Sequence, residues 1–507
     1  MTAAQSDRVE VVIVGSGAGG GPLAARLAQA GVSVVVLEAG AAFAPSDHLP
    51  DELTTGLYWM EERLSGGATP TAFGANNSGQ GVGGSTLHWG AFCPRPDAAD
   101  VALRRRSGQG WDWPIAHAEL IAYIEQVEAF IGVSGPSPYP WDLARRYAYA
   151  PPLRNAPAQA MARGCAALGI TATDSPAAVL TAARAQPHWG QRQACANCGA
   201  CHQGCFNAAK AGSDTSWLPL ARAHGAQVRA GCRMVDVERD ARGRIAAVVY
   251  RHEGREARLR CEALFLCAGG VETPRLLLNL GLANSSGQVG RNFMAHVATQ
   301  VWGRFEADMR MNRGYPSALM SEDLRAPADA DFAGGYLIQS LGVQPVTLAN
   351  TLARGAGLWG EPLISRLRDY NHLAGIGING ECLPSDDNRL TLSDEVDAFG
   401  LRKARIDFSY GPNERALDAH ARRTLTAIWE AAGARDILAA DRSAHTLGTC
   451  RMGTDPVQCV VDADGRSFDI DNLYVCDNST FPSALAANPA LTQMALGLRT
   501  ADRFLAA

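Results

Sequence analysis

The sequence contains no long apolar run. None of its segments reaches the roughly 18 consecutive apolar residues that a helix needs to span a bilayer, so we expect no membrane segment. Residues 1–8, ahead of the first apolar segment, contain no hydrophobic region of a secretion signal. We therefore expect a cytoplasmic protein, with export alongside a carrier subunit as the open alternative.

The chain also has no large charge excess and no paired cysteine framework. Its net charge of −5 gives no electrostatic basis for binding nucleic acid or an anionic membrane. Its 13 cysteines are an odd number, and several lie in apolar stretches (Cys261, Cys267, Cys450, Cys476), which is typical of buried thiols in a reducing compartment. With 507 residues, 47% of them hydrophobic, the chain predicts a globular protein of two or more domains.

Residues 10–40 predict a strand, a glycine-rich turn, a helix and a second strand. Apolar residues 11–14 enter the turn, a helix of small residues ends at Gly31, and a second apolar strand covers residues 32–37. A stretch of about 30 residues is the size of a nucleotide-binding βαβ unit.

The glycine spacing in this turn predicts dinucleotide binding. Gly15 allows the tight turn, Gly17 lets backbone N–H groups approach a pyrophosphate, and Gly20 lets helix and strand pack closely. Glu38 follows Gly20 by 18 residues, where a carboxylate can bond both ribose hydroxyls. A glycine turn in an unrelated α/β protein would not explain this acid. Glutamate rather than arginine favours FAD or NAD over NADP.

A second glycine-rich segment, residues 79–90, has five glycines in twelve residues and cannot be the interior of a stable helix or strand. Val82, Leu87 and Trp89 are interleaved with the glycines and argue against a merely flexible loop. We predict a backbone wrapped against the cofactor.

Four cysteines, Cys195, Cys198, Cys201 and Cys205, stand in a C-x2-C-x2-C-x3-C spacing. This resembles the iron–sulfur run of bacterial ferredoxins, although the proline after the fourth cysteine and a second run are missing. Zinc, local disulfides and packed thiols are alternatives, and zinc fits poorly because its CxxC pairs normally lie farther apart. An iron–sulfur cluster and structural thiols remain the two main interpretations.

A second strand–turn–helix is predicted farther along. A hairpin with its turn at residues 242–243 comes first. An apolar strand then runs to Cys267, Ala268 and Gly269 form a turn, and Thr273-Pro274 begins a helix. Residues 300–440 have no further turn of this kind, and we interpret them as the substrate domain.

The C-terminal residues carry the candidate chemistry. A strand ends at Asp477, and Asn488-Pro489 begins a helix that the Asn488 side chain can cap. The positive end of this helix can stabilise an anionic reduced flavin. His445 taken alone could be a core histidine, but beside Asn488 and a dinucleotide turn we predict a catalytic base.

Together these motifs resemble the glucose–methanol–choline (GMC) oxidoreductase family over nearly the whole chain. The most specific are residues 445–453 and Asn488-Pro489 behind an N-terminal dinucleotide turn. The resemblance implies bound FAD and oxidation of an alcohol to a carbonyl. We expect an α/β fold with a discontinuous Rossmann-like FAD-binding domain (residues 1–95, 190–300 and 440–507) and a substrate domain with a mostly antiparallel sheet backed by helices (residues 96–189 and 301–439).

The resemblance also assigns roles. His445 takes the hydroxyl proton while hydride passes to flavin N5, and Asn488 is a hydrogen-bond donor rather than a second base. Gly84 and Ser85 lie near the isoalloxazine, Val235 near the adenine, and Asp477 near the ribityl–pyrophosphate portion. The predicted cofactor-binding residues are Gly15, Ser16, Gly17, Ala18, Gly20, Glu38, Gly84, Ser85, Val235, Ala268, Gly269, Asp477, Asn488, Pro489 and Thr492.

One departure points to a branch of the family. Many members have Gly-Gly-Ser-Ser-x-x-Asn where this chain has Gly-Gly-Ser-Thr-Leu-His-Trp over residues 83–89. This variant looks more like the sugar and polyol dehydrogenases. Some catalytic subunits of that branch carry an iron–sulfur cluster, which would pass electrons to an outside acceptor, either a partner subunit or a dye-like molecule.

We therefore expect an FAD-dependent dehydrogenase or oxidase of a sugar, polyol or similar alcohol. Three alternatives are an oxidase of bulky apolar alcohols such as sterols or long-chain alcohols, a non-redox lyase of the same family, and an electron-transfer module without its own substrate site. The lining contributed by residues 300–440 distinguishes the first, being polar for sugars and apolar for sterols. Flavin bleaching by an alcohol under anaerobic conditions distinguishes the lyase. Loss of substrate oxidation in His445→Ala, with FAD still bound, would rule out the electron-transfer module.

Overall fold

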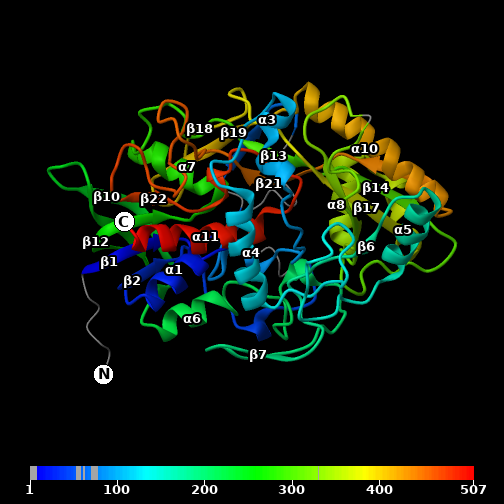
Figure 1. Ribbon diagram of the computed structural model, residues 1–507, viewed down its shortest axis with the longest axis horizontal. Coiled ribbons are helices and arrows are strands. Elements are labelled where there is room, and N and C mark those ends of the chain that lie inside the picture. The colour runs from blue at the N-terminus through cyan, green and yellow to red at the C-terminus, as the bar shows by residue number, and fades with distance from the viewer. Residues whose placement is uncertain (1–7, 53–58, 61–62, 70–77, 329) are drawn as a thin grey trace.

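The computed structural model describes residues 8–52, 59–60, 63–69, 78–328 and 330–507. Most of the start of the chain, on which the expectation of no secretion signal rests, lies outside these residues. Two sheets form the two halves of an elongated molecule, which lie side by side in Figure 1.

The first sheet has the strand order β10-β11-β12-β1-β2-β9, and β22 pairs with the end of β12. The contacts of β1 with β2 and β12, of β2 with β9, and of β12 with β22 are parallel. The apolar run in β1 is buried on both faces, as expected for a covered parallel strand. The strands are β1 (Arg8–Val14), β2 (Val34–Leu37), β9 (Gln227–Arg229), β10 (Cys232–Arg239), β11 (Ile245–His252), β12 (Arg255–Leu266) and β22 (Leu473–Val475).

Helices cover this sheet. Helix α1 packs against α11 and α6, and α4 packs on the outside of α11, as Figure 1 shows below the sheet. Helix α7 lies between the sheet and a three-stranded sheet of β18, β19 and β4. The helices are α1 (Gly20–Gln29), α4 (His117–Ile131), α6 (Trp217–Ala223), α7 (Gly269–Leu280) and α11 (Pro489–Leu505), and the small sheet is β4 (Arg63–Gly66), β18 (Arg389–Val396) and β19 (Arg402–Asp407).

The second sheet is antiparallel, with the order β20-β14-β17-β16-β15-β6 and with β13 and β21 joined at its side. Helices α5 and α10 back one face, burying the apolar side chains of β14, β16 and β17. The elements are β6 (Thr173–Asp174), β13 (Met294–Val297), β14 (Gln300–Arg304), β15 (Leu319–Ser321), β16 (Tyr336–Leu341), β17 (Leu373–Gly380), β20 (Arg435–Ala440), β21 (Ser443–Leu447), α5 (Ala156–Ala167) and α10 (Pro412–Ala431). The predicted antiparallel sheet backed by helices is confirmed.

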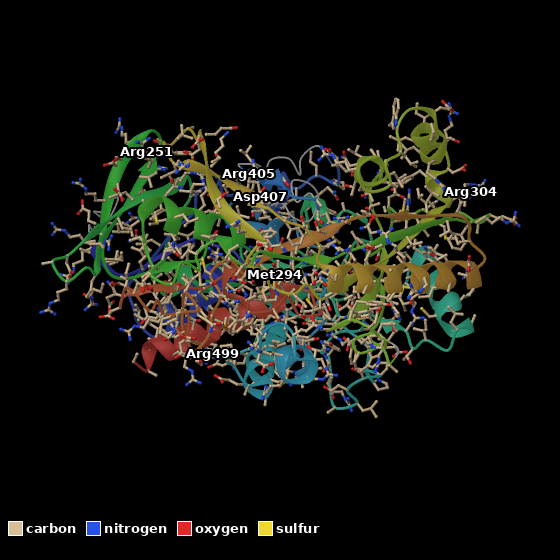
Figure 2. All side chains as sticks on the ribbon, turned by 90° about the horizontal axis from the view of Figure 1, so that it is seen from above. Arg251, Met294, Arg304, Arg405, Asp407 and Arg499 are labelled. Carbon is tan, nitrogen blue, oxygen red and sulfur yellow. The ribbon has the colours of Figure 1, made fainter. Side chains whose placement is uncertain are left out.

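The remaining elements are short helices and the strands of two two-stranded sheets. They are β3 (Trp59–Met60), β5 (Ser78–Gly79), β7 (Arg184–Gln186), β8 (Gly190–Arg192), α2 (Ala98–Val101), α3 (Leu103–Ser107), α8 (Pro345–Gly355) and α9 (Glu361–Arg368). In Figure 2 labelled arginines such as Arg251 and Arg304 reach outward at opposite ends, while Met294, fully buried, lies in the middle. Strand β13 therefore runs through the interior where the halves meet.

The predicted hairpin turn at residues 242–243 is confirmed between β10 and β11, with Gly243 at φ +79°. The expected start of a helix at Thr273-Pro274 is wrong, because α7 begins at Gly269 and contains Pro274 in its interior. Proline has no N–H, so the Gly270 carbonyl one turn earlier loses its helical donor. The buried hydroxyl of Thr449 donates to that carbonyl at 2.8 Å instead.

The Thr449 hydroxyl thus takes the place of the backbone N–H that Pro274 lacks, and a double-mutant cycle can test this. We expect Thr449→Val to lower the free energy of unfolding by about 1–3 kcal/mol, because a buried carbonyl is left unsatisfied. In a Pro274→Ala background the new N–H can reach the Gly270 carbonyl, so the same change should cost less. Urea unfolding of the wild type, the two single variants and the double variant, all with equal FAD content, measures the cost of Thr449→Val in both backgrounds. Equal costs in the two backgrounds would contradict this account.

Candidate active site

The carboxyl ends of β1, β12 and β22 bring three segments of the chain together. Gly15, after β1, has φ +101°, and a Cβ there would lie 2.3 Å from the Cys267 carbonyl oxygen. A Cβ at Gly20 would lie 2.0 Å from the Gly15 oxygen. A Cβ at Gly19, which the sequence argument did not use, would lie 1.9 Å from the Cys476 oxygen. The turn therefore accepts only glycine at these close approaches.

The glycine-rich segment 79–90 folds back onto this turn. Gly84 adopts φ +54°, and a Cβ there would lie 2.8 Å from the Cα atom of Gly17. The Ser16 hydroxyl accepts the Gly83 N–H at 2.9 Å, and the Ser85 hydroxyl accepts the Gly79 N–H at 3.0 Å. The two glycine-rich segments, 67 residues apart at Ser16 and Gly83, thus form one continuous backbone surface.

Glu38 lies at the end of β2 and is buried. One carboxylate oxygen accepts the Ser16 N–H at 3.1 Å and the Ser16 hydroxyl at 2.6 Å, and the other accepts the Gly40 N–H at 2.9 Å. Burial raises the pKa of Glu38, and these hydrogen bonds act against the rise. The carboxylate thus holds the turn in shape from within the cavity wall.

Asp477, at the end of β22, performs a similar task for the second turn. Its carboxylate accepts the Gly269 N–H at 2.8 Å, the Thr273 hydroxyl, and the Ser479 N–H at 2.9 Å. Burial raises its pKa, again against these hydrogen bonds. Asp477 therefore ties β22 to the start of α7.

One cavity of about 580 Å³ connects these segments to the antiparallel sheet. It runs from Arg233 and Glu272, past the two glycine-rich segments, to His445 and Asn488. The predicted site residues on its wall are Gly15, Ser16, Gly17, Ala18, Glu38, Gly84, Ser85, Ala268, Gly269, Asp477, His445, Asn488 and Pro489. Three predicted residues, Gly20, Val235 and Thr492, are buried and outside the lining, and Cys232, Arg233 and Met234 line the cavity where Val235 was expected.

His445 lies in β21 with φ +66°, a left-handed conformation that is uncommon for histidine and that occurs most often at functional sites. Its Nδ1 atom lies 3.0 Å from Nδ1 of His296, in the neighbouring strand β13. His296 Nε2 lies 2.8 Å from the carbonyl oxygen of Leu485. Both rings are therefore fixed in a chain of hydrogen bonds that ends on the backbone.

This chain determines which nitrogen carries each proton. The Leu485 carbonyl can only accept, so Nε2 of His296 must donate. Burial lowers the pKa of His296 to about 4, so its ring is neutral near pH 7 and its Nδ1 accepts from His445 Nδ1–H. Burial, with the positive charge of Arg442, also holds the pKa of His445 well below 6.5. Nε2 of His445 therefore carries a lone pair, as a general base requires.

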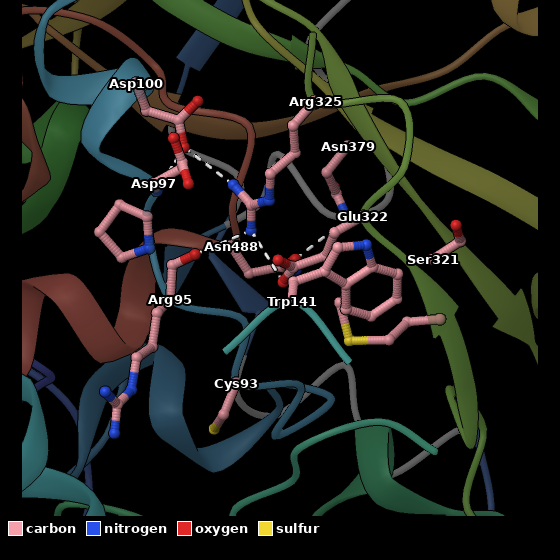
Figure 3. Close-up of polar contacts among 12 residues, drawn as sticks. Cys93, Arg95, Asp97, Asp100, Trp141, Ser321, Glu322, Arg325, Asn379 and Asn488 are labelled. Atoms are coloured by element: carbon pink, nitrogen blue, oxygen red, sulfur yellow. Dashed lines mark hydrogen bonds and ion pairs between the residues drawn. The ribbon is translucent and has the colours of Figure 1, made fainter. Parts of the chain in front are cut away.

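Asn488 precedes α11 but does not cap it, so the expected side-chain cap is wrong. Its Oδ1 atom instead accepts from Nδ2 of Asn379, in β17, at 3.0 Å; Figure 3 shows the two side chains near each other. With its oxygen engaged, the Asn488 amide presents its N–H donors. The pairing with β17 explains why the side chain leaves the helix end.

The antiparallel sheet supplies a floor of amides to the same cavity that His445 lines. Gln300, Gly377 and Gln339 are register partners across β14, β17 and β16, and all three line the cavity with Asn379. Gln300 is only 5% exposed, and its Oε1 atom has no hydrogen-bond partner within the described residues. Amide side chains both donate and accept hydrogen bonds, so this floor fits a polar ligand.

The four cysteines of the run lie beside the cavity but do not converge. Cys201 is buried, Cys198 is exposed, and Cys195 and Cys205 are intermediate. Over the described part of the chain, no three His, Cys, Asp or Glu side chains are placed to hold a metal ion. The iron–sulfur interpretation is therefore not supported, and the arrangement favours structural thiols.

This segment has a clear packing role. The buried ammonium of Lys210 donates to the carbonyl oxygens of Cys201, Leu87 and Trp89, at 2.6, 2.9 and 3.0 Å. His202 Nδ1 lies 3.1 Å from the His88 carbonyl oxygen. The cysteine run is thereby fastened to segment 79–90, which forms the cavity wall.

The cavity fits a flavin adenine dinucleotide in its donors and its shape. Gly17, Ala18 and Gly19 of the glycine turn line it, and a turn of this kind at the start of a helix presents backbone N–H groups to a pyrophosphate. The close backbone contact of Gly17 and Gly84 removes side chains along the path that a flat ring would take. The fold and cavity are thus those of a dinucleotide-binding oxidoreductase, with His445 on the cavity wall.

Comparison with known proteins identifies the family. Family models described as GMC oxidoreductase match residues 57–298 and 384–497. The chain belongs to the GMC oxidoreductase family and is an FAD-dependent enzyme acting on alcohols. The resemblance inferred from the motifs is confirmed.

Several relatives match almost the whole chain. It is 28% identical to the fructose dehydrogenase large subunit of Gluconobacter japonicus, over 98% of this chain and 97% of that protein. It is 28% identical to a 2-methyl-1,2-propanediol dehydrogenase of Mycolicibacterium austroafricanum, over 98% and 95%. A long-chain-alcohol oxidase of Arabidopsis thaliana is 25% identical, over 96% and 66%. The solved structure of a formate oxidase shares the fold, with a TM-score of 0.70 at 16% identity over 99% of both chains.

Sequence reasoning missed Gln300, Gln339, Asn379 and Arg442, which line the cavity with His445, and His296, whose ring contacts that of His445. No spacing rule connects them, because they come from different strands of the antiparallel sheet and its edges. Across residues 8–52, 59–60, 63–69, 78–328 and 330–507, no helix combines the length and the apolar character needed to cross a membrane.

The low pKa of His445 gives a pH prediction. A histidine base is active when neutral, so a pKa well below 6.5 keeps it active as the pH falls through that value. We expect kcat/KM for alcohol oxidation to stay flat from about pH 8 to about pH 6 and to decline only at lower pH. Anaerobic flavin reduction followed across this range measures it. An acidic limb at or above pH 6.5 would contradict the assignment.

The role of Glu38 can be tested with a neutral isostere. Glu38→Gln places an amide nitrogen against donors of Ser16 or Gly40, so we expect FAD affinity to fall on the order of ten-fold. Glu10→Gln is the matched control, because Glu10 also accepts the N–H and hydroxyl of one serine, Ser33, far from the cavity. Fluorescence titration of the apoproteins with FAD compares them. Equal affinities would show that the carboxylate is dispensable.

Proposed function

We propose that this enzyme oxidises the alcohol group of a sugar, a polyol or a similar compound to a carbonyl. FAD supplies the hydride acceptor, flavin N5. The residues on the cavity wall listed above, with the buried Gly20, Val235 and Thr492, are proposed to hold the cofactor. Residues 1–95, 190–300 and 440–507 are proposed as its domain, and residues 96–189 and 301–439 as the substrate domain.

The substrate hydroxyl loses its proton to His445, the first ring in the chain of hydrogen bonds that runs through His296 to the Leu485 carbonyl. His445 Nε2 takes the substrate hydroxyl proton, and the link through His296 to the Leu485 carbonyl keeps that nitrogen unprotonated beforehand. The ring becomes a cation as the alcohol loses its proton, and His296 Nδ1 accepts from it throughout. Asn488 donates to the substrate oxygen, because its own oxygen is held by Asn379.

The amide floor is the observation that carries the substrate class. Gln300, Gln339 and Asn379 lie in two rows on the cavity side of one sheet, with Gly377 leaving room between the glutamines. Amides both donate and accept, and each can bond a hydroxyl group. A substrate that lacks these hydroxyls would leave amides of the cavity wall unpaired, so we expect the enzyme to reject it. This supports a sugar or polyol over a sterol or long-chain alcohol.

An electron-accepting partner remains part of the proposal. The relative from Gluconobacter japonicus is named a large subunit, which supports a dehydrogenase that transfers electrons to another subunit or to a dye-like acceptor. Oxygen as the acceptor is the alternative, and reoxidation of the reduced flavin in air distinguishes the two.

The base assignment predicts a large kinetic effect. We expect His445→Ala to slow anaerobic flavin reduction by at least ~100-fold while FAD stays bound, the usual scale for a lost general base. His372→Ala, at a half-exposed histidine outside the cavity, is the control. Reduction of the variant at the wild-type rate would remove His445 from the mechanism.

A substrate panel tests the class in the same experiment. D-Glucitol and D-fructose should bleach the flavin, and 1-dodecanol should do so poorly. Bleaching by dodecanol alone would favour the oxidase of apolar alcohols. Bound flavin that no alcohol bleaches would favour a non-redox lyase.

A further inference from the structure

Arg442 lies between β20 and β21, three residues before His445, and its side chain lines the substrate end of the cavity. Its backbone is fixed, because its carbonyl oxygen accepts from the Ala298 N–H at 3.0 Å and from the Tyr410 hydroxyl at 3.3 Å. Its charge reaches both His445 and His202, lowering the pKa of each. The guanidinium is therefore held close to the reacting group.

Other buried arginines of this protein have built-in partners. Arg325 pairs with Asp100 at 2.8 Å and with Glu322 at 3.1 Å, which Figure 3 shows as dashed lines. Arg275 pairs with Glu272 and Asp397, and Arg192 donates to three backbone carbonyls and to Gln186. Each of these guanidinium groups thus has charged or polar partners within the chain.

Arg442 differs from them. No hydrogen bond or ion pair joins its guanidinium to another of the described residues, and burial alone lowers its pKa, to about 10. It is still a cation at pH 7. A planar cation with five donors facing a cavity without a partner is an unfavourable arrangement unless a ligand completes it.

The carboxylates on the cavity wall are engaged elsewhere. Glu38 and Asp477 bond the two turns, and Glu272 pairs with Arg275. Glu52, near the outer end, accepts the N–H groups of Val346 and Thr347, each at 2.6 Å. At the reacting end Arg442 therefore stands among neutral histidines and amides, and that end carries a positive charge.

We propose that Arg442 binds an oxyanion carried by the substrate, so that the enzyme prefers alcohols bearing a carboxylate or phosphate, such as sugar acids. This inference rests on the proposed oxidation of a sugar or polyol. A guanidinium forms two parallel bonds with a carboxylate, which fixes orientation as well as charge. The amides of Gln300 and Gln339 then face the hydroxyl groups of the same molecule.

A matched set of substrates tests the preference. D-Glucitol, D-gluconate and glucitol 6-phosphate share a carbon chain and differ in one terminal group, so they separate neutral, carboxylate and phosphate compounds. We expect kcat/KM of the wild-type holoenzyme to be at least ten-fold higher for one of the two anions than for glucitol. In Arg442→Gln that advantage should disappear because KM for the anionic substrate rises. Arg442→Lys should restore part of it. Arg242→Gln, in the exposed β10–β11 turn, is the control.

Binding provides a readout that does not need turnover. At constant ionic strength, acetate or inorganic phosphate should raise the thermal midpoint of the wild-type holoenzyme over chloride, and Arg442→Gln should lose this shift. The variant should be at least as stable as the wild type without added anion, because it removes an unpaired charge from the cavity wall. Loss of folding in the variant would show that Arg442 has a partner in the protein and would overturn the proposal.

The outcomes separate this proposal from the proposed function. If glucitol reduces the flavin and neither anion is preferred or stabilising, the assignment of Arg442 fails while alcohol oxidation stands. If Arg442→Gln slows glucitol and gluconate equally through kcat, the guanidinium serves the reaction centre rather than a substrate oxyanion, and the proposal is again wrong. If no alcohol reduces the flavin but acetate binding still depends on Arg442, the oxyanion site stands and the oxidation fails.

Discussion

The hydrogen bond between His296 and His445 is the contact on which the rest of the active site depends. It joins two strands of the antiparallel sheet at the point where that sheet meets the cofactor half of the molecule. Because the chain of donors ends on a backbone carbonyl, neither ring can change its tautomer without leaving a buried group unpaired. The fold therefore sets the protonation of the base, and it does so by burial rather than by a neighbouring carboxylate.

The two ends of the cavity are built on different physical grounds. At the end with the glycine turn, backbone groups form the cavity wall. Side chains are excluded at Gly15, Gly19 and Gly20, because a Cβ there would lie within about 2 Å of a carbonyl oxygen. At the substrate end, side-chain amides and one arginine line a wall whose polar atoms are only partly satisfied. The first end is shaped mainly by the backbone, whereas the second presents side chains that can both donate and accept hydrogen bonds.

Most residues that the sequence singled out in the two glycine turns lie on the cavity wall, whereas of the residues that the antiparallel sheet places there the sequence singled out only His445. A glycine turn, Glu38 and Asp477 are local signals tied to strand ends, and the parallel sheet brings strand ends together by topology. The row of Gln300, Gly377 and Gln339 depends on the register of three antiparallel strands, which no local pattern specifies. The start of α7 was misplaced for a similar reason, since the Thr449 hydroxyl that permits Pro274 inside the helix comes from a distant segment.

The position of Arg442 in the same short segment as His445 has an electrostatic consequence. In the free enzyme the guanidinium contributes to holding the pKa of His445 down, so it disfavours the protonated ring that forms when the alcohol loses its proton. An oxyanion bound to Arg442 neutralises that charge, and each unit by which the pKa of His445 then rises is worth about 1.4 kcal/mol toward the imidazolium. Substrate binding would in this way strengthen the base at the moment it is needed, while the unliganded site keeps the histidine neutral and ready to accept.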